Sequence, residues 1–184
     1  KYIYLDYLHS QKLGPEYLMA HSHADTLSLE ISLFNKRFIV NGGVSSYDKL
    51  KDRLYERSNL NHSTITVDDK NSSDVWDFFR TAKRAKPIQR SLSRNREQVA
   101  IKCSHDGYSN LFNNCIVTRN ATLKKDSLSI TDSVSKISGK NIFSKFIFHP
   151  DVRIKSLTKN KLVLKIKKKS GIKIIINKGN FEIK

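Results

Sequence analysis

Short alternations of apolar and polar residues run through most of the chain and predict β-strands. Residues 27–33 alternate leucine or isoleucine with serine or glutamate, a period of two that places one side of a strand in a core. Near the C-terminus, residues 162–166 and 172–176 repeat this pattern around a turn at residues 169–171. Further short strand-like runs lie at residues 38–40, 65–67, 99–101, 128–130, 146–148 and 152–154.

Helical periodicity is confined to residues 47–60, where Leu50 and Leu54 stand four residues apart. Many short strands at close spacing are typical of an antiparallel sandwich. We therefore predict an all-β fold, a two-sheet antiparallel β-sandwich with few or no helices. The length of 184 residues fits one domain over residues 1–184, and the aromatic run at residues 2–5 indicates a fragment of a longer chain.

The composition adds a strong positive charge, formally +17, from 34 Lys and Arg against 17 Asp and Glu. Such a charge favours nucleic acid, anionic lipid or acidic polysaccharide as partner. The abundance of lysine, asparagine and isoleucine is equally what an AT-rich genome produces. The Lys-rich tail from Lys159 is either a basic groove or, the interpretation we favour, the solvated face of a sheet. No apolar run is long enough to span a membrane, and Cys103 and Cys115 either pair or stay free.

Candidate chemistry gathers first at His21, His23 and Asp25. Residues two apart on an extended segment point to the same side, so both imidazoles and the carboxylate converge there. Imidazole and carboxylate are common zinc ligands, but zinc takes three or four protein ligands and this segment offers two or three. A purely structural histidine pair therefore stays open at this point.

A longer ordered pattern follows this segment. It comprises His21-Ser-His23-Ala-Asp25-Thr-Leu-Ser, Phe38-Ile-Val-Asn41-Gly-Gly43, Tyr47, Arg57-Ser58, Asn61-His62-Ser63-Thr64, Val67-Asp68, Trp76-Asp-Phe-Phe79-Arg80 and His105-Asp106-Gly107-Tyr108. In order and spacing, this series resembles the C-terminal domain of the heparinase II/III-like polysaccharide lyases. The resemblance extends over about residues 14–149, and its first block is the most specific part.

The resemblance implies a fold, a reaction and a setting. Such enzymes join an N-terminal α/α toroid to a C-terminal β-sandwich, and an acidic polysaccharide lies in the cleft between them. The reaction is β-elimination at a uronic acid, in which a base removes the C5 proton and an acid protonates the departing glycosidic oxygen. The principal tyrosine and the carboxylate-neutralising asparagine of the family sit in the toroid, which we expect to lie outside this chain. We also expect a periplasmic or exported bacterial protein.

The resemblance also assigns roles to residues of this chain. His21 matches a histidine that faces the cleft, so it is the expected catalytic residue. His23 and His62 match zinc ligands. Asn41 stands where the family has a ligating carboxylate, and the missing charge weakens the expected zinc site or shifts the role to Asp25 or a water.

Three further residues match positions near the cleft and are expected to bind substrate, namely Tyr47, Arg57 and His105. Each has a structural alternative: a turn-flanking aromatic for Tyr47, a salt bridge for Arg57, and for His105 a turn in which Gly107 takes a positive φ. Three aromatic residues, Trp76, Phe78 and Phe79, follow close by in the sequence. We expect them to pack in the core, and the alternative is a platform on which a sugar ring stacks.

Three functions are consistent with these features. The first is a lyase subdomain that is inactive without its toroid. The second is a polysaccharide-binding or scaffold module of the same fold without catalysis, which Asn41 slightly favours. The third, and least supported, is a basic nucleic-acid-binding β-domain, which needs exposed aromatics interleaved with Lys and Arg; only residues 76–84 have that composition.

Overall fold

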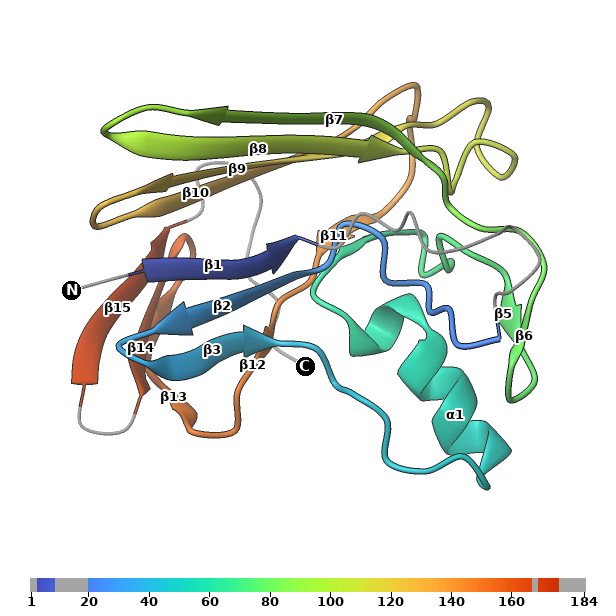
Figure 1. Ribbon diagram of the computed structural model, residues 1–184, viewed down its shortest axis with the longest axis horizontal. Coiled ribbons are helices and arrows are strands. Elements are labelled where there is room, and N and C mark those ends of the chain that lie inside the picture. The colour runs from blue at the N-terminus through green and yellow to red at the C-terminus, as the bar shows by residue number, and fades with distance from the viewer. Residues whose placement is uncertain (1–2, 9–19, 167–168, 176–184) are drawn as a thin grey trace. The chain divides into compact units, whose positions relative to one another are not determined.

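The computed structural model describes residues 3–8, 20–166 and 169–175, which form two compact units, Lys1–Ile147 and Phe148–Lys184. In the described part of the chain nearly all regular structure is antiparallel β-strand, beside a single α-helix (Figure 1). The predicted all-β sandwich with few helices is therefore confirmed. The expected single domain over residues 1–184 stays a prediction.

The first sheet has the strand order β1-β2-β3-β12. Its strands are β1 (Ile3–Leu8), β2 (Leu29–Leu33), β3 (Lys36–Val40) and β12 (Ile147–Phe148). In β2 the apolar residues are buried and the polar residues between them are half-buried, as the alternation predicts. The strand begins at Leu29 and not at Leu27, because Leu27 takes a left-handed φ of 63° in the preceding turn.

The second sheet has the order β10-β9-β8-β7. Its strands are β7 (Pro87–Arg94), β8 (Gln98–His105), β9 (Val117–Lys124) and β10 (Leu128–Val134). Within the first unit this sheet lies over β1 and β2 as the other layer of the sandwich (Figure 1). The buried cluster of this unit consists of Leu27, Ile65, Val67, Cys103, Tyr108, Cys115 and Val117. Both cysteines are free, and burial raises the pKa of each thiol.

One end of the first unit carries the helix, a 3-10 turn and four short strands, which form two two-stranded sheets. These elements are α1 (Leu50–Arg57), the 3-10 turn η1 (Asn59–Asn61), β4 (Ile65–Val67), β5 (Val75–Trp76), β6 (Arg80–Thr81) and β11 (Ile142–Ser144). The helix predicted within residues 47–60 is confirmed. Its buried residues are Arg53, Glu56 and Arg57, so this helix turns a charged face inward. None of the described helical segments is long and apolar enough to cross a membrane.

The second unit contains the sheet β13-β14-β15. Its strands are β13 (Val152–Thr158), β14 (Lys161–Ile166) and β15 (Lys169–Ile175). Leu162, Leu164 and Ile166 are buried, which confirms the alternation in β14. The turn predicted at residues 169–171 is wrong, because Ile166 pairs directly with Lys169 and the register shifts near Gly171, as in a β-bulge. Ile176, the predicted end of the last strand, lies outside the described residues.

Candidate functional site

His21 stands exposed beside two aromatic rings at the helical end of the first unit. Its ring meets Tyr47 edge-on at 6.2 Å between centroids and Phe79 at 5.3 Å. Tyr47 and Phe79 are stacked at 5.7 Å, and their exposed fractions are 53% and 39%. We call these three residues the aromatic cluster. It combines a titratable ring with exposed aromatic surface, which is what a sugar-binding face requires.

Arg53 of α1 lies against the aromatic cluster although its own side chain is fully buried. Its guanidinium carbon is 5.1 Å from the Tyr47 ring centre and 5.7 Å from that of Phe79. Its Nε donates to the carbonyl of Phe78 at 3.1 Å. Arg53 therefore places a fixed positive charge beside the rings that flank His21.

Arg53 also begins a line of polar contacts through both predicted zinc-ligating histidines. Its Nη1 lies 3.2 Å from His23 Nε2, His23 Nδ1 lies 3.2 Å from His62 Nε2, and His62 Nδ1 lies 3.3 Å from Asn41 Oδ1. Arginine can only donate, so His23 Nε2 accepts. The network then assigns the His23 proton to Nδ1 and the His62 proton to Nδ1, with Asn41 as the final acceptor.

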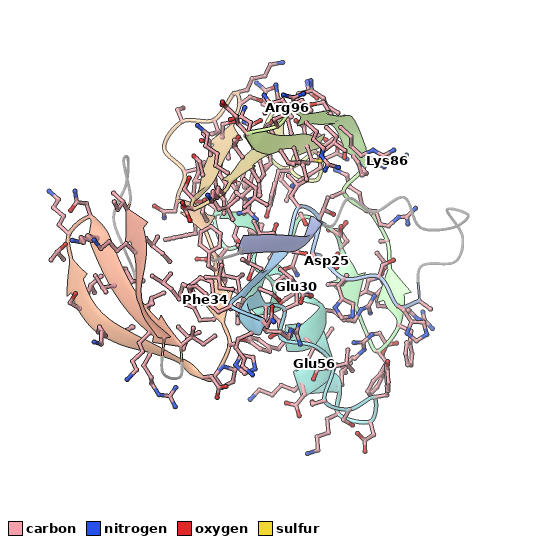
Figure 2. All side chains as sticks on the ribbon, turned by 60° about the vertical axis from the view of Figure 1, so that its left-hand side comes forward. Asp25, Glu30, Phe34, Glu56, Lys86 and Arg96 are labelled. Atoms are coloured by element: carbon pink, nitrogen blue, oxygen red, sulfur yellow. The ribbon has the colours of Figure 1, made fainter. Side chains whose placement is uncertain are left out.

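The electrostatic surroundings agree with a neutral His23. Burial, followed by the charges of Arg53 and Arg57, lowers the pKa of His23 to about 4. Beyond Asn41 the line continues, because Asn41 Nδ2 donates to Glu30 Oε1 at 3.1 Å. Figure 2 labels Glu30 on β2 and Glu56 on α1, which flank the two ends of this line. The histidine pair is thus held between a cation and a carboxylate.

The residues present fit a zinc ion only in part. Two nitrogen ligands on a tetrahedral zinc are about 3.3 Å apart, which matches the 3.2 Å between His23 Nδ1 and His62 Nε2. Asn41, however, faces His62 Nδ1, the ring nitrogen that would not bind the zinc. A residue in that position orients the histidine ligand and does not itself bind the metal. Arg53 points a donor at His23 Nε2, which has to carry the proton if Nδ1 binds a metal. Among the described residues, no group of three His, Cys, Asp or Glu is placed to hold a metal ion.

Asp25 differs from the sequence expectation in its local backbone. The segment from His21 to Leu27 is not extended; it bends, and the amide of Ser28 donates to the Asp25 carbonyl at 2.8 Å. The simple alternation that was expected to align His21, His23 and Asp25 therefore does not apply. Burial raises the pKa of Asp25 to about 7.

Arg57 has no exposed surface, so it cannot contact a bound polymer in this conformation. Its guanidinium donates to the carbonyl of Ser22 at 3.0 Å, to Thr81 Oγ1 at 2.6 Å and to the carbonyl of Asp77 at 3.1 Å. The expected substrate contact of Arg57 is replaced by a structural one. Arg57 ties the histidine segment to the β5–β6 hairpin, since one side chain binds both.

His105 is likewise fully buried, which contradicts its expected contact with substrate. Its Nδ1 accepts from the amide of Gly107 at 3.0 Å, and burial lowers its pKa to about 3. The turn expected here is present, but Gly107 is not among the positive-φ glycines. Glycine is needed because a Cβ would lie 2.5 Å from the carbonyl oxygen of Ser72.

Sequence reasoning also missed residues of the site. Trp76 and Phe79 were expected in the core, yet Trp76 is 48% exposed beneath the Arg80 guanidinium, and Phe79 belongs to the aromatic cluster. Arg53 carried no signal, because it stands in a helix where charged residues normally face solvent. Only the packing of α1 shows that Arg53 faces inward.

Fold and site together define the class: an antiparallel β-sandwich that presents a histidine among exposed aromatic side chains, near a pair of histidines of which His62 is buried and His23 is half-buried. The sequence matches the family model described as Heparinase II/III-like, C-terminal, over residues 7–182, and the chain belongs to that family. The family places the chain among proteins related to polysaccharide lyases. No curated protein and no solved structure gives a significant match.

Proposed function

We propose that this chain is the sandwich part of a lyase that cleaves uronate-containing polysaccharide by β-elimination. The observation that carries the proposal is the exposed His21 in the aromatic cluster, beside the buried charge of Arg53. The remaining catalytic groups belong to a toroid domain outside this chain. Because such polymers lie outside the cytoplasm, we propose a periplasmic or exported protein, which cell fractionation tests.

The chemistry of β-elimination divides among these residues. The C5 proton leaves to a base, the electron pair forms the double bond to C4, and the glycosidic oxygen departs with a proton. His21 exchanges a proton with the sugar or binds it, since an imidazole can both donate and accept a proton. Tyr47 and Phe79 supply aromatic surface against a sugar ring, and Arg53 adds positive potential beside a uronate carboxylate.

The first test replaces His21 by Gln in the full-length protein and measures the ultraviolet absorbance of unsaturated uronate products. We expect turnover to fall roughly 10²- to 10⁴-fold, the usual contribution of a positioned acid or base, while polymer binding changes little. Tyr47→Ala should weaken polymer binding. Tyr55→Ala is its matched control, because both tyrosines are 53% exposed but Tyr47 belongs to the aromatic cluster.

Other outcomes separate the alternatives. If the unaltered protein binds polysaccharide without releasing unsaturated products, the non-catalytic module is correct and the lyase proposal fails. Preference for a nucleic acid over an acidic polysaccharide, at equal salt concentration, favours the third function. Unchanged turnover in His21→Gln removes His21 from the chemistry.

We propose in addition that His23 and His62 hold a zinc ion that stabilises the sandwich, with Asn41 orienting His62. The spacing of the two ring nitrogens supports this, and Arg53 has to move away from His23 Nε2. We expect purified protein to retain zinc and His23→Ala to lose it, as elemental analysis measures. Asn41→Ala should lower zinc affinity about 10- to 100-fold, as is usual for an orienting partner. An unaltered protein that takes up no zinc from excess contradicts the proposal.

A further inference from the structure

A second feature of the first unit lies outside the aromatic cluster and the histidine pair. A pocket of about 400 Å³ opens between the segment that follows β6 and the turn that follows β8. Its lining residues are Ala82, Lys83, Arg84, Lys86, Asp106, Ser109 and Asn110. Figure 2 labels Lys86, which stands at the end of the β7–β10 sheet. Three of the lining residues, Ala82, Lys83 and Arg84, belong to the basic-aromatic stretch at residues 76–84 of the sequence.

The charge of the pocket suits an anion. Lys83, Arg84 and Lys86 line it against a single carboxylate, that of Asp106. One oxygen of that carboxylate is already hydrogen-bonded, because Asp106 Oδ1 accepts from the backbone amide of Lys86 at 2.7 Å. The pocket thus keeps an excess of positive charge together with the polar side chains of Ser109 and Asn110.

Lys83 gives the more specific indication. Its Nζ is shielded from solvent and has no hydrogen-bond partner among the residues that the structure describes. An ammonium group buried without an acceptor is unfavourable, and an oxyanion in the pocket would supply the acceptors once the flexible lysine turns toward it. The backbone that carries Lys83 is fixed, since its carbonyl accepts from the amide of Asp74 at 2.7 Å and the Ala85 amide donates to Ser73 Oγ at 3.0 Å.

The pocket is also close in sequence to the candidate active site. Phe79 of the aromatic cluster stands four residues before Lys83, a separation of at most about 14 Å along an extended chain. Between them lies Arg80, whose guanidinium covers the exposed Trp76 ring at 4.9 Å. The length of chain between Phe79 and Lys83 therefore keeps the pocket within reach of one short oligosaccharide bound at the aromatic cluster.

We propose that this pocket is a second anion subsite, which binds a sulfate or carboxylate group of the same polymer at a distance from the sugar beside His21. The inference rests on the proposed function, because it takes the ligand to be an acidic polysaccharide. Its role is affinity and placement of the polymer, and it takes no part in bond cleavage.

The test compares Lys83→Gln and Lys86→Gln with Lys102→Gln in the full-length protein. Lys102 is an exposed residue of β8 outside the pocket, so its replacement removes the same charge from elsewhere. The probes are a sulfated heparin oligosaccharide and a carboxylate-only oligogalacturonate, with binding followed by titration calorimetry at several salt concentrations. Loss of one charge-assisted hydrogen bond should weaken binding about tenfold in Lys83→Gln. Lys102→Gln should change binding less than about twofold, as a screened surface charge does.

Each result has a defined meaning. Weaker binding of the heparin probe alone identifies sulfate as the group bound, and weaker binding of both probes identifies an oxyanion in general. Pocket variants that bind both probes as Lys102→Gln does overturn the proposal. Lys86 is exposed, so its variant keeps the test valid if Lys83→Gln fails to fold.

Failure of the subsite and failure of the proposed function are distinguishable. Pocket variants should lose affinity while turnover at saturating polymer stays unchanged, the opposite of the expectation for His21→Gln. If the unaltered protein binds neither polymer, the proposed function fails. In that case inorganic sulfate serves as the probe: it should raise the thermal midpoint of the unaltered protein and of Lys102→Gln, but not of Lys83→Gln. An equal shift in all three overturns the pocket as an anion site.

Discussion

Individual buried polar residues decide how the loops of the candidate site are held. Arg57 binds the carbonyl of Ser22 beside His21 and His23, and Arg53 reaches His23 itself. His105 is buried just as deeply but takes part in a turn, where its Nδ1 accepts a hydrogen bond from the backbone amide of Gly107. Such side chains cannot be exchanged freely, since a buried polar group that loses its partner costs roughly 1–3 kcal/mol.

The low pKa of His105 predicts an acid-sensitive contribution to stability. Its folded pKa is about 3 against an ordinary value of 6.5, so the unfolded state binds more protons between these values. The free energy of unfolding should therefore fall as pH drops below about 6.5, by up to about 1.4 kcal/mol per pH unit. Urea unfolding at several pH values measures this slope.

His105→Gln should reduce that slope by the share of His105, while His23, whose pKa is lowered to about 4, keeps its own share. His149→Gln is the control, since His149 keeps about a third of its side chain exposed. If the slope in His105→Gln equals that of the unaltered protein, another group causes the acid sensitivity.

At the scale of elements, strands β9 and β10 anchor both loops that carry the histidine pair. Arg119 of β9 donates to the carbonyls of Leu27 and Ser63, at 2.8 Å and 2.7 Å. It also forms a bidentate ion pair with Asp132 of β10, in which Nε donates to Oδ1 at 2.8 Å and Nη2 donates to Oδ2 at 2.7 Å. One buried guanidinium therefore joins the loop before β2, the loop before β4 and the second sheet.

Removal of this guanidinium should be strongly destabilising. Arg119→Met leaves Asp132 as a buried carboxylate without its cation, and we expect a loss of about 3–5 kcal/mol in the free energy of unfolding. Arg119→Lys should recover part of the loss, because the charge returns without the planar fork. The matched control is Arg90→Met on the exposed strand β7, with an expected change within about 0.5 kcal/mol. A loss for Arg119→Met no larger than for Arg90→Met contradicts the anchoring role.

At the scale of the whole molecule, the formal charge of +17 influences both association and stability. Long-range attraction brings an acidic polymer to the protein without selecting among polyanions. In the folded state the positive side chains also repel one another, because cations such as Arg53 and Arg57 are packed close together. Under the proposed function, recognition of a particular polymer therefore comes from placed groups, such as the aromatic cluster and the pocket beside Lys83.

Salt should consequently stabilise the free protein and weaken its binding to polymer. An increase from about 10 mM to about 150 mM sodium chloride shortens the screening length from about 30 Å to about 8 Å. We expect the thermal midpoint of the free protein to rise and the affinity for an oligogalacturonate to fall. A midpoint that falls over this range means that attractive ion pairs outweigh the net repulsion.

Much of the fold could be predicted from the sequence because strand alternation is a local property. The alternation in β2 and β14 predicted which residues are buried, and the helix within residues 47–60 was located. The errors fall where the backbone departs from regular geometry, at the left-handed Leu27 and in the bulged register near Gly171. A periodic pattern carries no information about such local departures.

By itself, the sequence determined the all-β class, the family and the candidate residues His21, His23 and His62, because these depend on local pattern and on the order of motifs along the chain. Only the tertiary structure decided the burial of Arg57 and His105, the exposure of Phe79 and the contact of Arg53 with His23. Those facts depend on which segments far apart in the sequence pack together. A charged helix such as α1 appears solvent-exposed in sequence, and its inward face is set by the neighbours that supply hydrogen bonds.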